Sequence, residues 1–149
     1  FSKLSEKARR HLPFLGLFSE RVDIRSLCAF SNGYYEPDKQ AYRLVFGDNL
    51  QTTDWKKILK EALKAGILES HNENVYKLHP TLPWYLIKIF IKQYSITALR
   101  DLENQLMDFY KEISDTLYSE LDRNFKLSNE ILDIEEANLI KNFRLAEKK

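Results

Sequence analysis

The segment from Val75 to Leu86 constrains the fold of this chain more than any other part of its sequence. It begins with Val75-Tyr76-Lys77-Leu78, which has the alternation and residue types of a strand. After His79, two prolines open an apolar helix, where proline suits the first turn. The preceding Ile67-Leu68-Glu69 and the polar turn from Ser70 to Asn74 complete a β-hairpin. The sequence therefore predicts a short hairpin followed directly by a helix.

Two helices are predicted in the first part of the chain. Ser5 is a suitable N-cap for a helix that runs to about Leu17, and Pro13 predicts a kink within it. Asp23 is a suitable cap for a second helix from Ile24 to about Phe30.

A third long helix is predicted just before the hairpin. Thr53 or Asp54 is its expected cap, and Gly66 is its expected left-handed stop. Its apolar face carries Trp55, Ile58, Leu59, Ala62 and Leu63. Between the second and third helices the signal is weak, with one or two helical turns expected within residues 38–46.

The remainder of the chain is predicted to be helical. The helix opened by Pro80 and Pro83 should break near Tyr94 to Thr97. Apolar residues then recur every three or four positions, which predicts one long helix from Ala98 to about Leu121.

A final helix is expected to run antiparallel to that long helix. Asp133 and Glu136 have the spacing of an acidic capping box at its start. Leu139, Ile140 and Phe143 are its expected apolar stripe. The predicted fold class is thus mainly α: a winged helix with a short β-hairpin wing over residues 1–93, then an extension over residues 94–149 that forms a helical hairpin or the first repeat-like helices.

Length and charge limit the classes of function. A chain of 149 residues can bury one substantial core, and its net charge of +1 gives no general reason to expect nucleic acid or a membrane surface as partner. Residues 1–98 hold 15 basic and 10 acidic side chains, whereas residues 99–149 hold 8 and 12. The one cysteine, Cys28, stands among apolar neighbours and predicts a buried, reduced thiol in a cytoplasmic protein. The most apolar run, Trp84 to Ile91, is too short to span a bilayer.

His79 is the principal candidate for a binding residue. An imidazole at a helix start can donate a hydrogen bond to a phosphate, where backbone N–H groups also point. The alternative is a histidine that caps the turn before Pro80 and has no ligand.

Enzyme chemistry has little support in the sequence. It contains no Gly-x-x-x-x-Gly-Lys-Ser/Thr loop, and the three histidines and one cysteine show no metal-ligand spacing. We therefore expect no catalytic residue, no metal site and no cofactor bound by these residues alone.

The order of these motifs resembles a known family. Three segments together resemble the winged-helix domain of STAND-class (NB-ARC-like) ATPases. They are the opening helix with Leu12, Leu15, Leu17 and Phe18, the Trp55 helix ending in Ala65-Gly66-Ile67-Leu68, and the segment Tyr76-Lys77-Leu78-His79-Pro80. The later part of the chain resembles the helices that lead from such a domain into tetratricopeptide-type repeats. The stretches that carry this resemblance are Phe109-Tyr110, Leu117-Tyr118 and Glu135-Glu136-Ala137-Asn138-Leu139.

The resemblance implies a regulatory role in a larger parent protein. In that family a histidine at this strand-to-helix junction contacts the phosphates of ADP and holds the closed state, which would be the role of His79. Pro80 departs from the acidic residue that many relatives have next. The implied partners are an upstream nucleotide domain and downstream repeats in the same chain, with ADP or ATP bound by the parent, and an oligomer of the parent is compatible with this.

Two other functions stay open. Lys56, Lys60 and Lys64 line one face of the third helix, with Lys57 beside them, as in a DNA-binding winged helix. Base recognition usually needs Arg, Asn or Gln near the start of that helix, where this chain has Trp55 and lysines. A stand-alone protein–protein adaptor is the other alternative. The aromatic groups Tyr34-Tyr35, Trp84-Tyr85 and Tyr94 are better explained by core or domain-interface packing than by a ligand cage.

Overall fold

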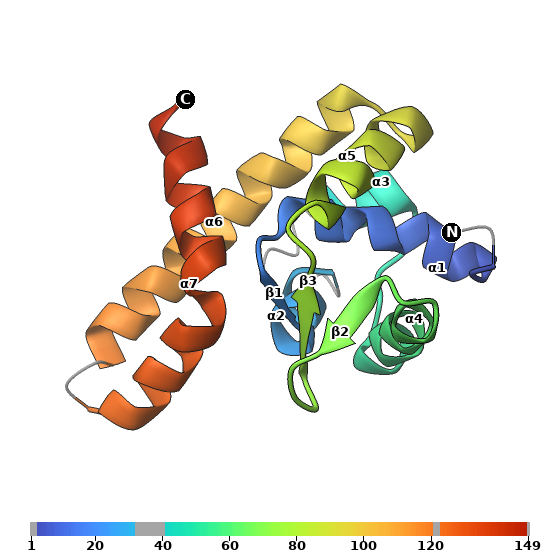
Figure 1. Cartoon of the computed structure of the whole chain (residues 1–149). Coiled ribbons are helices and arrows are strands. Elements are labelled where there is room, and N and C mark those ends of the chain that lie inside the picture. Colours follow the sequence, from blue (N-terminus) through green and yellow to red (C-terminus); the bar gives the residue numbers. More distant parts are fainter. Residues whose placement is uncertain (1–2, 32–40, 121–122, 149) are drawn as a thin grey trace.

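The first helix starts as the sequence predicts and then changes its helical type. The computed structural model describes residues 3–31, 41–120 and 123–148 (Figure 1). Helix α1 (Glu6–His11) is capped by Ser5, whose Oγ accepts from Ala8 N at 3.2 Å. The chain continues as a 3₁₀ helix, η1 (Leu12–Leu17), with Pro13 in its first turn. Because proline has no N–H and its ring clashes with the preceding turn, the α-helical hydrogen bonds end where Pro13 enters.

A small antiparallel sheet has the strand order β1-β3-β2. Strands β2 (Leu68–Ser70) and β3 (Val75–Leu78) form the predicted hairpin, with Glu69 opposite Lys77. Strand β1 (Arg21–Asp23) pairs with the other edge of β3, with Val22 opposite Tyr76. β1 was not predicted, because three residues are too few to show a strand pattern.

Helices α2 (Ile24–Ser31) and α4 (Thr52–Lys64) stand on either side of the short helix α3 (Ala41–Phe46) in the sequence. The predicted cap of α2 is confirmed, since Asp23 Oδ1 accepts from Arg25 N at 2.8 Å. The predicted cap of α4 at Thr53 or Asp54 is wrong. Gln51 is the cap, and Asp54 closes a capping box by accepting from Gln51 N at 3.0 Å.

The ends of these segments agree in part with the predictions. Gly66 follows α4 with φ +74°, the left-handed conformation predicted for the stop. Part of the helical turn expected within residues 38–46 is present as α3, while positions 38–40 lie outside the described residues, as do Tyr34 and Tyr35.

Three helices follow the hairpin. Helix α5 (Leu82–Gln93) ends just before the predicted break, and α6 (Ile96–Glu120) is the predicted long helix. Helix α7 (Phe125–Glu147) then turns back along α6 (Figure 1). Its predicted start at Asp133 is wrong, because Asn124 caps the helix and Asp133 and Glu136 lie inside it.

Helices α1, α2, α3 and α4, strand β1 and the β2–β3 hairpin together form a winged helix. The structure confirms the mainly helical class with a short β wing. Its core is apolar and rich in aromatic rings, with Phe14, Phe18, Tyr42, Phe46 and Trp55 almost fully buried. From α6, four residues that follow the predicted period join the same core: Leu99, Leu102, Leu106 and Phe109. The boundary between residues 93 and 94 stays a prediction.

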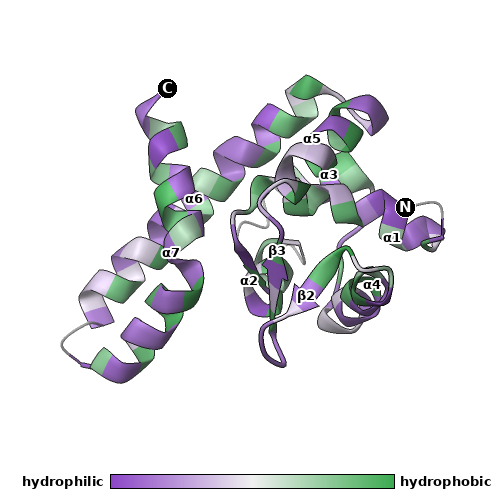
Figure 2. Ribbon diagram, in the orientation of Figure 1, coloured by the Kyte–Doolittle hydropathy of each residue, from purple (hydrophilic) through white to green (hydrophobic). Residues whose placement is uncertain are grey.

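The buried face of α7 differs from the predicted apolar stripe. Hydrophilic and hydrophobic positions alternate along α6 and α7 (Figure 2). Leu139 is buried, but Ile140 and Phe143 are 42% and 49% exposed. Glu135, Asn138 and other polar residues are buried instead, because α7 packs against β1 and the main-chain carbonyls that precede it. The last helix is therefore attached by polar groups.

Candidate functional site

His79 lies on the surface, between the end of β3 and the start of α5. Its Nδ1 accepts from Thr81 N at 3.2 Å and lies 2.9 Å from Thr81 Oγ1. Its carbonyl oxygen accepts from Leu82 N at 2.9 Å. With Nδ1 as an acceptor, the neutral ring carries its proton on Nε2. Nε2 has no hydrogen-bond partner among the described residues, so it is free to donate to a ligand.

The backbone at the start of α5 offers few donors to an anion. Thr81 N and Leu82 N are both directed at His79, and Pro83 has no N–H. A helix start usually presents its first N–H groups to a ligand. At this junction a phosphate contact would thus depend on the imidazole more than on the backbone.

Two aromatic residues extend the exposed surface beside His79. Trp84 is 76% exposed and Tyr85 is 52% exposed. Trp84 therefore does not belong to the core, and its predicted place in a domain interface stays a prediction. Tyr94 differs, since it is half-buried and its hydroxyl donates to Arg10 O at 2.8 Å.

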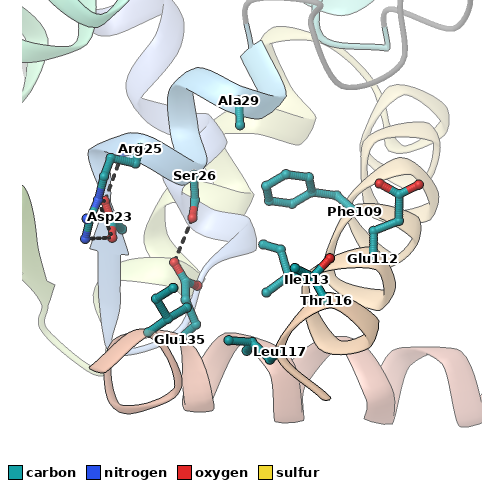
Figure 3. A pocket seen from close by; sticks show the side chains of 11 residues that line it. Asp23, Arg25, Ser26, Ala29, Phe109, Glu112, Ile113, Thr116, Leu117 and Glu135 are labelled. Atoms are coloured by element: carbon teal, nitrogen blue, oxygen red, sulfur yellow. Dashed lines mark hydrogen bonds and ion pairs between the residues drawn. The ribbon is translucent and has the colours of Figure 1, made fainter. Parts of the chain in front are cut away.

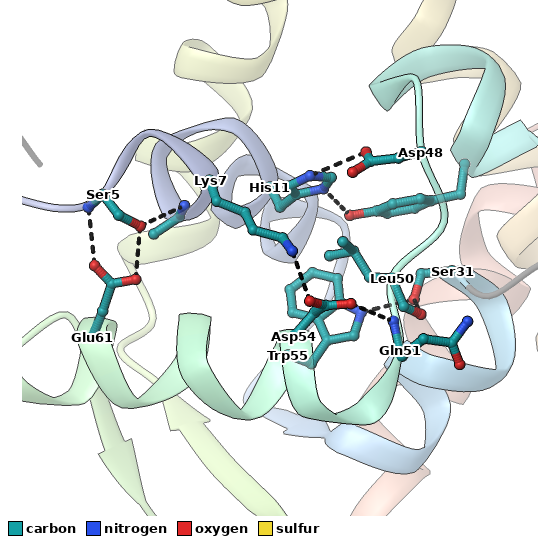
Figure 4. Close-up of polar contacts among 12 residues, drawn as sticks. Ser5, Lys7, His11, Ser31, Asp48, Leu50, Gln51, Asp54, Trp55 and Glu61 are labelled. Carbon is teal, nitrogen blue, oxygen red and sulfur yellow. Dashed lines mark hydrogen bonds and ion pairs between the residues drawn. The ribbon is translucent and has the colours of Figure 1, made fainter.

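The lysines of α4 form one exposed basic face made by Lys56, Lys57, Lys60 and Lys64. None of the four forms an ion pair with another described residue. The acidic residues of α4, Asp54 and Glu61, contact α1 and its cap and not these lysines. Asp54 pairs with Lys7 at 2.6 Å, and Glu61 accepts from Ser5 N and Oγ (Figure 4). Within the described part of the chain, no acidic side chain therefore neutralises the basic face.

His11 is fully buried within the aromatic core and has no exposed face for a ligand. Its Nδ1 lies 2.6 Å from the Tyr42 hydroxyl, and its Nε2 lies 3.4 Å from Asp48 Oδ1 (Figure 4). Burial lowers the pKa of His11 from 6.5 to about 4, so the ring is neutral at pH 7 and the Asp48 contact is not an ion pair. We assign the proton to Nε2, with the Tyr42 hydroxyl donating to Nδ1.

A second group of polar residues holds α7 against the winged helix, and the sequence analysis did not identify it. Asn138 Oδ1 accepts from Ser19 N at 2.6 Å, and its Nδ2 donates to Arg21 O at 2.7 Å. Glu135 accepts from Ser26 Oγ at 2.7 Å and from the Tyr110 hydroxyl at 2.8 Å. The helical phase was available as a signal, because Glu135, Asn138 and Asn142 share one face with Leu139.

Lys141 connects α7 to η1. Its Nζ donates to the carbonyl oxygens of Gly16 and Phe18, both at 3.3 Å. Burial lowers the pKa of Lys141 from 10.5 to about 8, which leaves most of the amine charged at pH 7. Its charge is therefore held against main-chain oxygens at the end of a buried helix.

Gly16 lies where α5 packs closely against η1. A Cβ atom at this position would lie 3.0 Å from Ile87 N and 3.2 Å from Leu86 Cβ, so a larger residue would require α5 to shift. Lys141 of α7 holds the same segment through Gly16 O. The helix that follows the His79 junction and the last helix therefore both contact η1.

Two further observations concern the described part of the chain. Within residues 3–31, 41–120 and 123–148, no cluster of three or more His, Cys, Asp or Glu side chains has the arrangement of a metal site. In the same segments, every helix is too short or too polar to cross a lipid bilayer.

Comparison with known proteins gives no relative. No protein-family model, no curated protein and no solved structure matches this chain. The functional argument therefore depends on the geometry of the chain itself and on the sequence resemblance.

Proposed function

We propose that this chain is a regulatory and interaction module of a STAND-class signalling NTPase. It would relay the nucleotide state of an upstream nucleotide domain to helical repeats downstream in the same parent protein. The observation that carries the proposal is Trp84, an indole that is 76% exposed one short turn after His79. Large exposed aromatics next to a polar anchor are typical of protein interfaces.

His79 would supply the polar contact of this interface. Its Nε2–H points away from the hydrogen bonds that Nδ1 makes with Thr81, so the ring is held in one orientation by its own turn. A phosphate of ADP bound by the upstream domain would accept from Nε2, and Trp84 would pack on the same domain. The cofactor is therefore expected in the parent, shared between two domains.

The relay would pass through η1. A movement of α5 would act on η1, against which it packs closely at Gly16, and Gly16 O accepts from Lys141 of α7. Exchange of ADP for ATP would release the His79 surface, and the winged helix would move together with α6 and α7 as one body. A cytoplasmic location belongs to the same proposal, supported by Cys28, a buried free thiol.

The decisive experiment is calorimetric titration of ADP into the full-length parent protein, with His79→Asn as the test variant. Asparagine preserves an acceptor for Thr81 N, as in an Asx turn, but removes the Nε2 donor. His71→Asn is the matched control, because His71 is an exposed histidine in the hairpin turn. We expect His79→Asn to weaken ADP binding about tenfold or more, about 1.4 kcal/mol, while His71→Asn binds as wild type.

Unchanged ADP affinity in His79→Asn, with an unchanged melting temperature, would contradict the phosphate contact. His79 would then be a turn cap only, and an adaptor function through the Trp84 surface would be favoured. A parent sequence without a phosphate-binding loop would contradict the whole proposal.

Duplex DNA binding is the second candidate, favoured by the four exposed lysines of α4, which form no ion pair with another described residue. It predicts a complex whose affinity falls steeply with salt and weakens in Lys60→Ala, because each lysine would contact a phosphate. Fluorescence anisotropy with a labelled duplex separates the two candidates.

A further inference from the structure

A pocket lies between α2 and the hairpin formed by α6 and α7 (Figure 3). Its volume is about 380 Å³, within the roughly 300–1,000 Å³ of small-molecule sites. Glu112 and Thr116 are exposed at its rim, so a ligand can reach it from solvent. None of its described lining residues belongs to the β3–α5 junction, so the pocket is separate from His79 and does not depend on the function proposed above.

One wall of the pocket is apolar. Phe109, Ile113 and Leu117 occupy successive turns of α6 and face the pocket (Figure 3). Ile131 of α7 and Ala29 of α2 complete this wall. Ile113 and Leu117 are only half-buried, so the predicted apolar stripe of α6 continues past the core and into the pocket.

The opposite end of the pocket is acidic. Glu135 is 3% exposed, and the groups that hydrogen-bond to it, the hydroxyls of Ser26 and Tyr110 and the side chain of Asn138, are all uncharged. It forms no ion pair with any described residue. A carboxylate offers about four acceptor positions, so these three donors leave acceptor capacity on the Glu135 oxygens.

Among the described residues that line the pocket, Arg25 is the one cation, and it is already paired. Arg25 Nη2 lies 2.7 Å from Asp23 Oδ2, and Arg25 Nε contacts both Asp23 oxygens. With Asp23 offset by Arg25, the charges of Glu135 and Glu112 remain, so the described lining is net negative.

A buried carboxylate is costly unless an opposite charge lies in direct contact with it, because its charge has lost water. Arg25 lies close enough to interact electrostatically with Glu135, but its guanidinium is paired with Asp23 and forms no ion pair with Glu135. Burial raises the pKa of Glu135, and the nearby Asp23 charge acts in the same direction. An ammonium group brought by a ligand would supply an opposite charge in direct contact with Glu135.

We propose that this pocket binds an organic cation, in which an ammonium group contacts Glu135 and an aliphatic or aromatic body packs against Phe109, Ile113 and Leu117. The acidic end excludes organic anions, and the apolar wall disfavours small hydrated metal ions. A bound ligand touches α2, α6 and α7 together, so it stabilises the attachment of the helical hairpin to the winged helix.

The test uses phenethylamine as the probe, with phenethyl alcohol as its neutral counterpart and phenylacetate as its anionic counterpart. Each is titrated into the ¹⁵N-labelled chain, and backbone amide shifts are followed by NMR. We expect saturable shifts in α2, α6 and α7 with the amine, and at least tenfold weaker binding of the alcohol and the acid.

Two variants and one control locate the site. Glu135→Gln removes the charge and should weaken amine binding at least tenfold, whereas Glu136→Gln, at an exposed neighbouring position, should bind as wild type. Leu117→Trp fills the apolar end and should block binding with Glu135 intact, which keeps the test valid if Glu135→Gln unfolds. Equal binding of amine and alcohol, shifts that map elsewhere, or wild-type binding in Leu117→Trp would overturn the proposal.

Discussion

The winged-helix core and the contact between α7 and β1 are both buried, but their chemistry is opposite. In the core, the Phe14 ring lies 5.0 Å from Tyr42, 5.5 Å from Phe30 and 6.1 Å from Phe46, measured between centroids. At the α7 contact, Asn138 and Lys141 bond to main-chain atoms of residues 16–21. One region is held by apolar packing and the other by directed hydrogen bonds.

The two regions should therefore contribute differently to the stability of the fold and to the position of α7. Apolar burial is non-directional and supplies most of the free energy of folding. A buried hydrogen bond adds only about 0.5–1.5 kcal/mol, but a buried polar group that loses its partner costs about 1–3 kcal/mol. The core should therefore determine whether the chain folds, whereas Asn138 and Lys141 determine where α7 docks.

The largest expected effect comes from Phe14→Ala, which truncates the ring at the centre of the aromatic core. Phe14 is fully buried, so we expect a loss of about 3–5 kcal/mol in the free energy of unfolding. Urea denaturation followed by circular dichroism measures it. Leu44→Ala is the matched control, because Leu44 is 81% exposed and its truncation should change stability by less than about 0.5 kcal/mol. An equal loss of unfolding free energy in both variants would contradict the burial of Phe14 in the core.

The next largest effect concerns His11, the buried histidine of that core. The pKa of His11 is 6.5 in the unfolded chain and about 4 in the folded one, so between these values the unfolded state binds more protons. The free energy of unfolding therefore falls as the pH falls through this window. The separation of the two pKa values corresponds to about 3 kcal/mol at the acid end.

His11→Gln isolates this contribution. Its free energy of unfolding, measured by urea titration from pH 7 to pH 4, should fall less steeply than that of wild type. His71→Gln, which replaces an exposed histidine in the hairpin turn, is the control for the loss of a histidine outside the core. Identical slopes in wild type and His11→Gln would show that folding does not suppress protonation of His11.

Patterns that repeat over several turns were predictable from the sequence, and single contacts between distant segments were not. The period of Leu99, Leu102 and Leu106 predicted α6, and the alternation in Val75 to Leu78 predicted β3. β1 is too short for a period, and its pairing with β3 is visible only in the folded chain.

The candidate sites show the same limit. His79 could be placed at the β3–α5 junction because neighbouring residues define both elements. Glu135 could not be placed, because its partners Ser26 and Tyr110 come from two other helices. The Asp133–Glu136 spacing matched a capping box, but the helix already begins at Phe125, where Asn124 is the cap.

The smallest expected effect, from Asn138→Ala, tests the polar contact directly. The change leaves Ser19 N and Arg21 O without their side-chain partner, and we expect a loss of about 1–3 kcal/mol. Native-state hydrogen exchange should locate this loss in α7, while amides of α4 in the winged helix keep wild-type protection. Asn129→Ala is the control, because Asn129 is an exposed asparagine on the same helix. If Asn138→Ala lowered protection equally in α4 and α7, the two regions would unfold as one unit. Polar attachment would then give α7 no independence from the apolar core.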